Sequence, residues 1–348
     1  MNPYITTLFL FTLGLGTTIT FASSHWLLAW MGLEINTLAI LPLMAQTHHP
    51  RAVEATTKYF LTQATAAATL LFASTTNAWL TGQWNISLMM HPVPAALVIL
   101  ALSLKIGLAP LHTWLPEVLQ GLTLTTGLIL STWQKLAPFS LLLQLPLHNQ
   151  PLLIALGLVS TLVGGWGGLN QTQLRKILAY SSIAHLGWMV LVLQFAPSLT
   201  LLALITYFVM TSAAFLTLHF SAATTVNALP TTSTKAPMVT AIFPMVLLSL
   251  GGLPPLTGFL PKWLILHHLT KEALPLVATF AALTALLSLY FYLRLSYAMT
   301  LTLSPNTPAT TASWRLPSTN HTAFLSCMLA GSSLLLPLAP AVAALLAL

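Results

Sequence analysis

Long apolar stretches separated by short polar turns make up most of the chain. A helix crosses a bilayer in about 20 predominantly apolar residues, whereas strands of a membrane β-barrel alternate apolar and polar positions. The stretches here are continuously apolar, and most end at Pro, Asn, His or Thr. The pattern predicts an all-α, polytopic membrane protein with about 11 transmembrane helices. The expected segments are 3–22, 25–45, 56–80, 92–120, 123–145, 150–169, 174–194, 199–220, 237–270, 274–299 and 322–345.

The fourth segment (92–120) and the ninth (237–270) are too long and too rich in Pro and Gly for simple helices. They contain KIGLAPLHTWLPE at 105–117 and GGLPPLTGFLPKW at 251–263, which align without a gap at an offset of 145 residues. The identical pairs are Gly107 with Gly252, Leu108 with Leu253, Pro110 with Pro255, Leu111 with Leu256, Leu115 with Leu260 and Pro116 with Pro261. So many matches indicate an internal repeat.

The proline and glycine content predicts a broken helix in each of these two segments. A proline removes a backbone donor and clashes with the preceding turn, and freed backbone groups at membrane depth are tolerated where they line a wet cavity. Each broken helix is the fourth of five, so two five-helix repeats are expected, the second inverted because five is odd. The expected domains are 1–145, 146–299, and a connector with the last helix at 300–348. The alternative is that Pro and Gly only kink helices for packing.

Composition agrees with a membrane protein and excludes several functions. Charged residues make up 4% of the chain and hydrophobic residues 56%, against about 25% charged residues in soluble domains. The net charge is +7, but the basic residues are scattered and form no patch, which argues against nucleic acid as a partner. The single cysteine, Cys327, excludes an internal disulfide, a cysteine-bound iron–sulfur cluster and a zinc finger. The glycine clusters at 14–16 and 164–168 lie in apolar segments, so they are not dinucleotide-binding loops.

Basic residues at the segment ends orient the chain, because positive charge marks the cytoplasmic or matrix side. When successive loops are assigned to alternate sides, most basic residues fall on the side of the N-terminus. These are Arg51, Lys58, Arg175, Lys176, Lys235, Arg294 and Arg315, against Lys271 alone on the other side. The N-terminus is therefore expected on the matrix side and the C-terminus on the opposite side. The first segment has no basic region or cleavage site, so it is expected to be a retained helix.

Four ionisable residues lie inside apolar segments. Glu34 is near the middle of the second segment, Lys105 precedes the first break, Lys135 is midway through the fifth segment, and Lys262 follows the second break. A charge at the centre of a spanning helix costs about 2.5–3.5 kcal/mol on insertion scales. We therefore expect these residues to serve function rather than stability.

Carboxylate and amine groups at this depth suit proton transfer. A buried lysine can lose its proton, and a nearby carboxylate helps to retain it, so Glu34 and Lys105 are expected to form a switchable pair. The alternatives are a static ion pair or a lysine that reaches the membrane interface. Glu117, close to the end of its helix, is as well explained by an interfacial position.

Two histidines are weaker candidates for the same chemistry. His112 lies inside the first broken segment, and His185 is mid-helix in YSSIAHLGWM. An imidazole can relay protons near neutral pH, but either residue can equally be a polar side chain packed against a neighbouring helix. The pairs at 48–49 and 267–268 are adjacent on helices and do not face one metal ion, so no metal site is expected.

These residues resemble the antiporter-like membrane subunits of respiratory complex I. The resemblance covers the whole chain and is most specific in LEINTLAILPLM, KIGLAPLHTWLPEV, STWQKLAP, LRKILAYSSIAHLGWM and GGLPPLTGFLPKW. It implies that Glu34 and Lys105 form the coupling pair, with Lys135 the central relay and Lys262 near the exit. The chain departs from longer members of the family, because only three helices precede its first broken helix.

The resemblance also implies a location and partners. The chain is expected in the mitochondrial inner membrane, surrounded by lipids and in contact with other complex I subunits, especially neighbouring antiporter-like ones. NAD, FMN, iron–sulfur clusters and ubiquinone are expected on the other subunits, with no cofactor bound by this chain.

The leading hypothesis is a core membrane-arm subunit that takes part in proton translocation, coupled to electron transfer from NADH to ubiquinone elsewhere in the complex. A non-conducting structural scaffold of the membrane arm is the alternative. An independent Na⁺/H⁺ antiporter is a third reading, which the lack of an acidic cluster disfavours.

Overall fold

The computed structural model describes residues 3–46, 48–89, 91–146, 150–234, 237–302, 322–338, 340–341 and 344. Over these residues the regular secondary structure is helical, apart from two isolated β-bridges that pair His25 with Asn85 and Gln173 with Thr225. The chain forms two compact units, Met1–Gly157 and Leu158–Leu348, hereafter unit 1 and unit 2. The division falls inside helix α8 (Gln150–Gly168).

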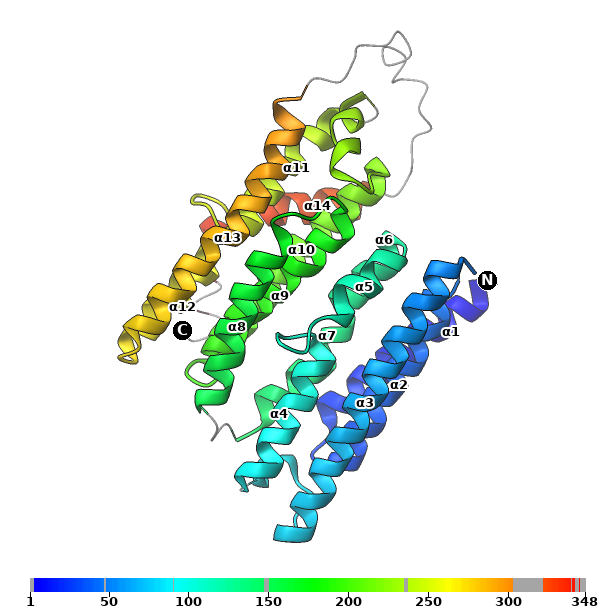
Figure 1. Ribbon diagram of the computed structural model, residues 1–348, viewed down its shortest axis with the longest axis vertical. Helices are drawn as coiled ribbons and strands as arrows, with labels where there is room; N and C mark the ends of the chain where they lie inside the picture. Colours follow the sequence, from blue (N-terminus) through cyan, green and yellow to red (C-terminus); the bar gives the residue numbers. More distant parts are fainter. Residues whose placement is uncertain are drawn as a thin grey trace. The chain divides into compact units, whose positions relative to one another are not determined.

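Unit 1 begins with three long helices and continues with shorter ones (Figure 1). Its elements are α1 (Pro3–Ala22), α2 (Trp26–Met44), α3 (Pro50–Thr81), the 3₁₀ turn η1 (Ile86–Leu88), α4 (Pro92–Ile106), α5 (Trp114–Gly121), α6 (Leu124–Ser131) and α7 (Trp133–Gln144). Helix α3 packs against α4 and α5, while α7 packs against α1, α2 and α4. The interior of the unit therefore lies around α7, which carries Lys135.

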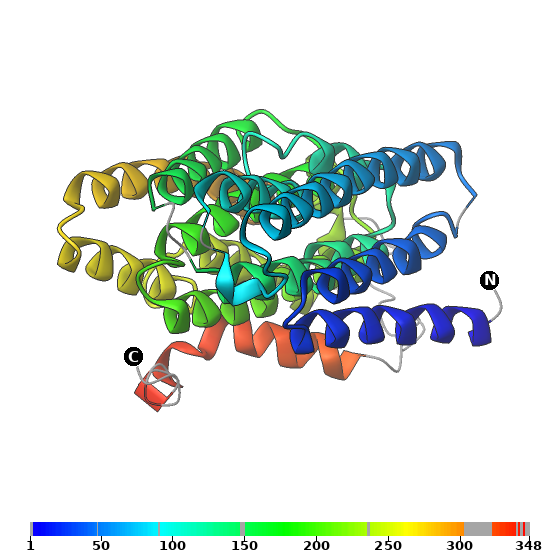
Figure 2. The same ribbon diagram turned by 90° about the horizontal axis from the view of Figure 1, so that it is seen from below.

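Helices α1 and α2 run side by side (Figure 2), and their backbones are in close contact at two glycines. A Cβ atom added at Gly16 would lie 2.9 Å from the carbonyl oxygen of Gly32, and one added at Gly32 would lie 2.9 Å from the carbonyl oxygen of Gly16. A residue with a side chain would force the helices apart, so the glycine at the end of the GLG stretch serves helix packing.

The fourth segment is interrupted between α4 and α5. Gly107 has φ 86°, in the left-handed region that glycine adopts readily, and its N–H donates to the carbonyl of Ser103 at 2.9 Å. Residues 108–113 form turns that include Pro110, after which Trp114 starts α5. The interruption lies within the stretch that the sequence marks as broken.

The fifth segment, expected as one helix over 123–145, is two helices separated at Thr132. The hydroxyl of Thr132 donates to the carbonyl of Leu128 at 2.7 Å, and the N–H of Lys135 reaches only three residues back, to the carbonyl of Thr132. Pro138 further weakens the following turn, because it has no N–H to donate. Lys135 therefore lies one turn after an interruption that the sequence did not predict.

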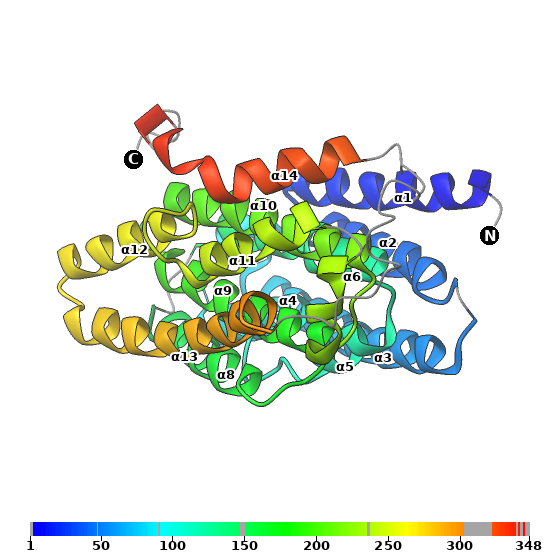
Figure 3. The ribbon, with the colours of Figure 1, turned by 90° about the horizontal axis from the view of Figure 1, so that it is seen from above.

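Unit 2 is built around α9 (Leu174–Val192), which is buried along almost its whole length. The other elements are α10 (Pro197–Ser221), η2 (Val226–Ala228), η3 (Pro230–Thr234), α11 (Pro237–Gly251), α12 (Phe259–Lys271), α13 (Pro275–Thr300), α14 (Thr322–Leu334) and η5 (Leu336–Leu338). Helices α12 and α13 lie side by side, and both contact α9 (Figure 3). The sequence-marked interruption of the ninth segment separates α11 from α12, after Gly252 at φ 80°.

The connection between α10 and α11 contains η2 and η3, and Leu229 within it is 1% exposed because it packs inside unit 2. One expectation for the terminal region needs correction. The last helix was expected over 322–345, but α14 ends at Leu334 and Pro337 follows in η5. The connector over 303–321 lies outside the described residues.

Five of the described helices are long and apolar enough to cross a membrane by length and composition. They are α1, α2, α8 from Pro151, α10 and α13. The shorter apolar helices include α4 and α11, which are each the first part of an interrupted segment, and α14. With 13 residues, α14 has a length of about 20 Å, against about 30 Å of hydrocarbon. The helices thus define a membrane fold, while the expected number of crossings stays a prediction.

Candidate functional site

In unit 1 the end of α4 leaves backbone carbonyls that no helical N–H reaches, and side chains take over as donors. The indole Nε1 of Trp114 donates to the carbonyl of Leu104 at 3.1 Å. The amide Nε2 of Gln63, on α3, donates to the carbonyl of Lys105 at 3.4 Å. Neutral donors therefore satisfy the broken end of this helix.

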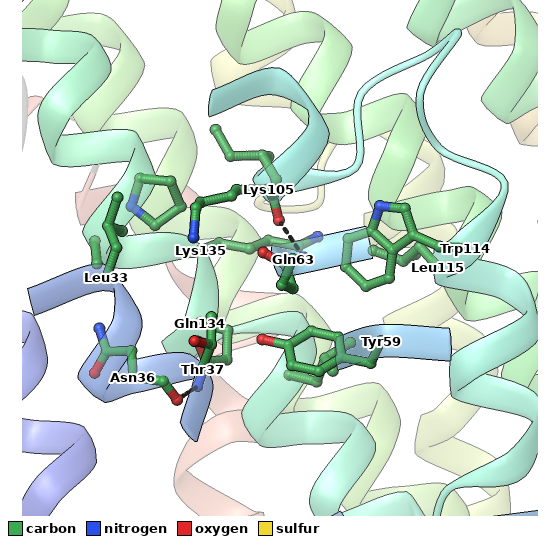
Figure 4. A pocket seen from close by; sticks show the side chains of 14 residues that line it. Leu33, Asn36, Thr37, Tyr59, Gln63, Lys105, Trp114, Leu115, Gln134 and Lys135 are labelled. Carbon is green, nitrogen blue, oxygen red and sulfur yellow. Dashed lines mark hydrogen bonds between the residues drawn. The ribbon is translucent and has the colours of Figure 1, made fainter. Parts of the chain in front are cut away.

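Lys105 is buried at this broken end without using its ammonium group as a cap. Its side chain is 7% exposed, and Nζ has no hydrogen-bond partner among the described residues. Lys135, on α7, is 2% exposed. Both lysines line one cavity, in which about 20 Å³ is open to the centre of a water molecule (Figure 4). That space is sufficient for a single water.

Polar side chains share the cavity with the two lysines. The full lining is Leu33, Asn36, Thr37, Tyr59, Gln63, Lys105, Ile106, Trp114, Leu115, Leu130, Gln134, Lys135, Ala137 and Pro138. Gln134 Nε2 donates to the backbone carbonyl of Asn36 at 3.2 Å, which links α7 to α2 (Figure 4). The cavity is thus a polar pocket enclosed by apolar helices.

Glu34 is connected to this cavity through its neighbour on α2. The hydroxyl of Thr37 lies 3.0 Å from Glu34 Oε2 and donates to it, and Thr37 lines the cavity. Glu34 and Lys105 form no direct ion pair among those in the described part of the chain. The carboxylate thus hydrogen-bonds within its own helix, and the switchable pair with Lys105 stays a prediction.

In unit 2 the broken end of α11 is capped differently. Lys262, from the far side of the interruption, donates through Nζ to the carbonyl of Gly251 at 2.7 Å and to that of Leu250 at 3.4 Å. Its side chain is half-buried. Here the lysine itself satisfies the helix end, where the backbone dipoles favour a positive charge.

His185 and Lys262 line a second, smaller cavity, in which about 10 Å³ is open to water centres. His185 is 9% exposed, and its ring centre lies 5.8 Å from that of Tyr207. The sequence marked both residues separately and did not join them. His112, in contrast, lies half-buried in the turns between α4 and α5 and is absent from the lining of the Lys105 cavity.

The other charged residues of unit 1 gather at one end of α3. Lys58 Nζ lies 2.8 Å from Glu54 Oε1 and 2.9 Å from Glu117 Oε2. All three side chains are substantially exposed, so Glu117 belongs to an exposed ion-pair network and not to the cavity. The pair with Lys58 connects α5 to α3.

Sequence reasoning missed the neutral polar residues of the site: Asn36, Thr37, Tyr59, Gln63 and Gln134. Asn36 and Gln134 each lie within two residues of an ionisable residue in an apolar run, which was the available signal. Over the described residues, no group of three or more His, Cys, Asp or Glu side chains is placed to hold a metal ion.

Comparison with known proteins places these features in a family. The transmembrane family of NADH:quinone oxidoreductases and Mrp antiporters matches residues 23–288, and the family defined by the C-terminus of NADH dehydrogenase subunit 2 matches residues 289–343. NADH-ubiquinone oxidoreductase chain 2 of Tetraodon nigroviridis is 71% identical over 98% of both chains. The protein of the same name from Salmo salar is 70% identical over 100% of both chains.

Solved structures show the same fold. A chain of respiratory complex I from Thermus thermophilus matches with a TM-score of 0.83 and 29% identity, over 99% of this chain and 80% of that chain. A chain of the archaeal membrane-bound sulfane sulfur reductase matches with a TM-score of 0.85 and 18% identity, over 97% of this chain and 74% of that chain.

Proposed function

Because this chain belongs to the NADH-ubiquinone oxidoreductase chain 2 family, we propose that it takes part in proton translocation as a core membrane-arm subunit of respiratory complex I. Electron transfer from NADH to ubiquinone takes place on other subunits. Those subunits hold NAD, FMN, iron–sulfur clusters and ubiquinone, and this chain supplies groups that hold and pass protons in the inner mitochondrial membrane.

The observation that carries this proposal is the pair of buried lysines at one polar cavity. Lys105 and Lys135 are 7% and 2% exposed, and a charge at membrane depth costs about 2.5–3.5 kcal/mol on insertion scales. Nothing in the packing of unit 1 requires an ammonium group there, since Trp114 and Gln63 already cap α4. An amine beside space for one water is suited to bind and release a proton.

The proposed path in unit 1 begins at Glu34 and continues through Thr37 to Lys105 and Lys135. Lys262 and His185 carry the proton in unit 2, where they line one cavity. His112 has a weaker claim, because it does not line the cavity of the lysines. Moving a charge across the membrane costs about 2.3 kcal/mol per 100 mV, so movement between these groups has to be gated.

We place these groups in two inverted five-helix repeats, 1–145 and 146–299, within a chain of about 11 crossings. Support comes from the equivalent interruptions, each preceded by a left-handed glycine, Gly107 or Gly252. The two isolated bridges also occupy corresponding positions, ahead of the second helix of each repeat. The excess of basic residues puts the N-terminus on the matrix side and the C-terminus on the intermembrane-space side.

The test is to replace Lys135 or Lys105 with Met in the assembled complex and measure proton pumping together with quinone reduction. Proton yield per NADH is expected to fall in both variants, while the complex still assembles. The matched control is Lys271→Met, because Lys271 is exposed at the end of α12. Unchanged proton pumping in both variants would refute the proton-relay hypothesis. Poor assembly of the complex with normal coupling of pumping to quinone reduction would favour the scaffold role.

A further inference from the structure

The short helix α14 is bonded directly to the second break. It packs against α10 and α11 (Figure 3) and ends at Leu334. The last carbonyls of a helix have no N–H of their own helix to accept from. The side-chain hydroxyl of Thr257, in the turns between α11 and α12, donates to one of them, the carbonyl of Ser332. Both residues are buried, so a side chain of the break caps α14 inside the protein.

Thr257 also stands at the start of the helix that carries Lys262. Its backbone carbonyl accepts from the N–H of Leu260 at 3.3 Å, in the first turn of α12. Lys262 follows in the same helix, and its Nζ reaches back across the break to the carbonyl of Gly251 at 2.7 Å. The position at which Thr257 is held therefore sets how far the ammonium group lies from the end of α11.

Close packing does not by itself fix α12 against α14. Thr257 and Leu260 line an apolar cavity of about 110 Å³, and Leu335, directly after α14, lines it too. The next residue along the chain is, by contrast, in tight contact with α11, because a Cβ atom added at Gly258 would overlap the carbonyl oxygen of Ser249. Side chains across a cavity lose their mutual contacts, so the hydroxyl bond of Thr257 is what connects the start of α12 to α14.

The first break has the same backbone turn without this hydroxyl. At the offset of 145 residues Thr257 aligns with His112, whose carbonyl accepts from the N–H of Leu115 at 3.0 Å. Moreover, α14 lies within residues 289–343, which match the C-terminus of NADH dehydrogenase subunit 2, and outside residues 23–288, which match the shared transmembrane family. The bond is therefore made by the part of the chain that is particular to the subunit 2 family.

We propose that Thr257 is a positioning residue for Lys262. Through its bond to α14 it holds the start of α12 where the ammonium group reaches the end of α11. The inference rests on the proposed function, in which Lys262 passes the proton in unit 2. Thr257 itself neither takes up nor releases the proton. The C-terminal helix thereby acts on proton transfer without contributing an ionisable group to it.

The first experiment changes the hydroxyl alone, in the assembled complex. Thr257→Val keeps the branched shape but removes the donor, so the proton yield per NADH is expected to fall. Thr257→Ser keeps the hydroxyl and is expected to retain the yield of the unaltered complex. The matched control is Thr279→Val, because Thr279 is exposed on α13 and its hydroxyl donates within its own helix. An unchanged yield in Thr257→Val, or an equal loss in Thr257→Ser, would overturn the proposal.

The second experiment asks whether Thr257 acts through Lys262. If it does, Thr257→Val combined with Lys262→Met lowers the proton yield no further than Lys262→Met alone, because two residues that act through one group are not additive. A further loss in the double variant would mean a general structural role and refute the proposal. Full pumping by Lys262→Met alone would refute the proton path of unit 2. A loss in Lys262→Met with none in Thr257→Val would refute only the role of Thr257.

High-resolution maps give a readout that does not depend on pumping. In Thr257→Val, Lys262 Nζ is expected to lie beyond hydrogen-bond distance of the Gly251 carbonyl, against 2.7 Å in the unaltered protein. An unchanged bond there would contradict the proposal. The map of the unaltered complex needs no variant to assemble. It is expected to show the Thr257 hydroxyl within hydrogen-bond distance of the Ser332 carbonyl, and a longer separation would refute the proposal.

Discussion

The broken ends of α4 and α11 solve one physical problem in two ways. Both helices stop at a left-handed glycine and leave carbonyls at the interruption. In unit 1, Trp114 and Gln63 cap those carbonyls with neutral donors. In unit 2, the ammonium group of Lys262 caps the carbonyls of Leu250 and Gly251, the counterparts of Lys105 and Ile106. In unit 1, Lys105 beside the break therefore does not cap the helix end, whereas in unit 2 Lys262 does.

The difference follows from three substitutions in the aligned stretches. At the offset of 145 residues, Leu250 replaces Lys105, Phe259 replaces Trp114, and Lys262 replaces Glu117. Phenylalanine has no donor, so a carbonyl cap has to come from elsewhere. The lysine on the other side of the break caps the next two carbonyls, those of Leu250 and Gly251. A helix break thus does not fix the role of the lysine beside it, because that role depends on which other donors reach the carbonyls.

The second break has a glycine, Gly258, where the aligned position of the first break is Thr113. The space around Gly258 is too small for a side chain. A Cβ atom at Gly258 would overlap the carbonyl oxygen of Ser249 and lie 2.8 Å from its carbonyl carbon. Gly258→Ala is therefore expected to destabilise the fold by about 4 kcal/mol or more, in the range of severe core changes. The measurement is the amount of assembled complex on native gels, with Gly14→Ala as control, because a Cβ added at Gly14 meets nothing within 4 Å. Normal assembly of Gly258→Ala would show that the second break adapts as readily as the first.

Removing the charged cap is expected to cost more than removing a neutral one. Lys262→Met leaves two carbonyls without a donor and is expected to destabilise the protein by about 2–3 kcal/mol, whereas Gln63→Leu is expected to cost about 1 kcal/mol. Thermal unfolding of the purified complex compares the two variants. Similar midpoints would mean that the cap on α11 is no stronger than the one on α4.

Trp114→Phe gives the break of unit 1 the same residue that unit 2 has at the aligned position, Phe259. It removes the bond from Nε1 to the carbonyl of Leu104 and keeps most of the ring, so a loss of about 1 kcal/mol is expected. In the Lys262→Met background, Phe259→Trp tests the converse, because a new indole adds a donor at the carbonyl of Ser249, the counterpart of Leu104, next to those that lost the ammonium. Recovery of part of the lost thermal stability is expected. If stability did not recover, an indole donor would not serve at the second break as it does at the first.

The smallest effect is expected at the exposed charges. The hydrogen bond from Lys58 and its charge lower the pKa of Glu54, which precedes the spanning part of α3, below its usual value of 4.5. The pair therefore contributes stability above pH ~4.5, and this contribution is lost as the pH falls through the lowered pKa. Glu54→Gln should lower thermal stability slightly at neutral pH, where the pair contributes, and flatten the acid limb, so that the variant and the unaltered protein converge at low pH. An altered proton yield at neutral pH would contradict this view.

Both interruptions and the four ionisable residues inside apolar segments could be located from the sequence, because Pro, Gly and charge are unambiguous in an apolar chain. Sequence reasoning did not find the division of the fifth segment at Thr132, which depends on a hydroxyl bond to Leu128 that a continuous helix also tolerates. It could not assign the caps on α4. Gln63 lies on another helix, 42 positions from Lys105, and no local pattern connects them.

The amino-acid sequence by itself determined that this is a helical membrane protein, where two of its helices break, and which charged residues lie at depth. These follow from local chemistry: apolar runs seek lipid, proline lacks a donor, and charge avoids hydrocarbon. Only the tertiary structure decided that Lys105 and Lys135 share a cavity with Asn36, that Lys262 caps α11 beside His185, and that Glu117 pairs with Lys58. Those outcomes depend on which helices pack together and on which donors lie within reach of each carbonyl.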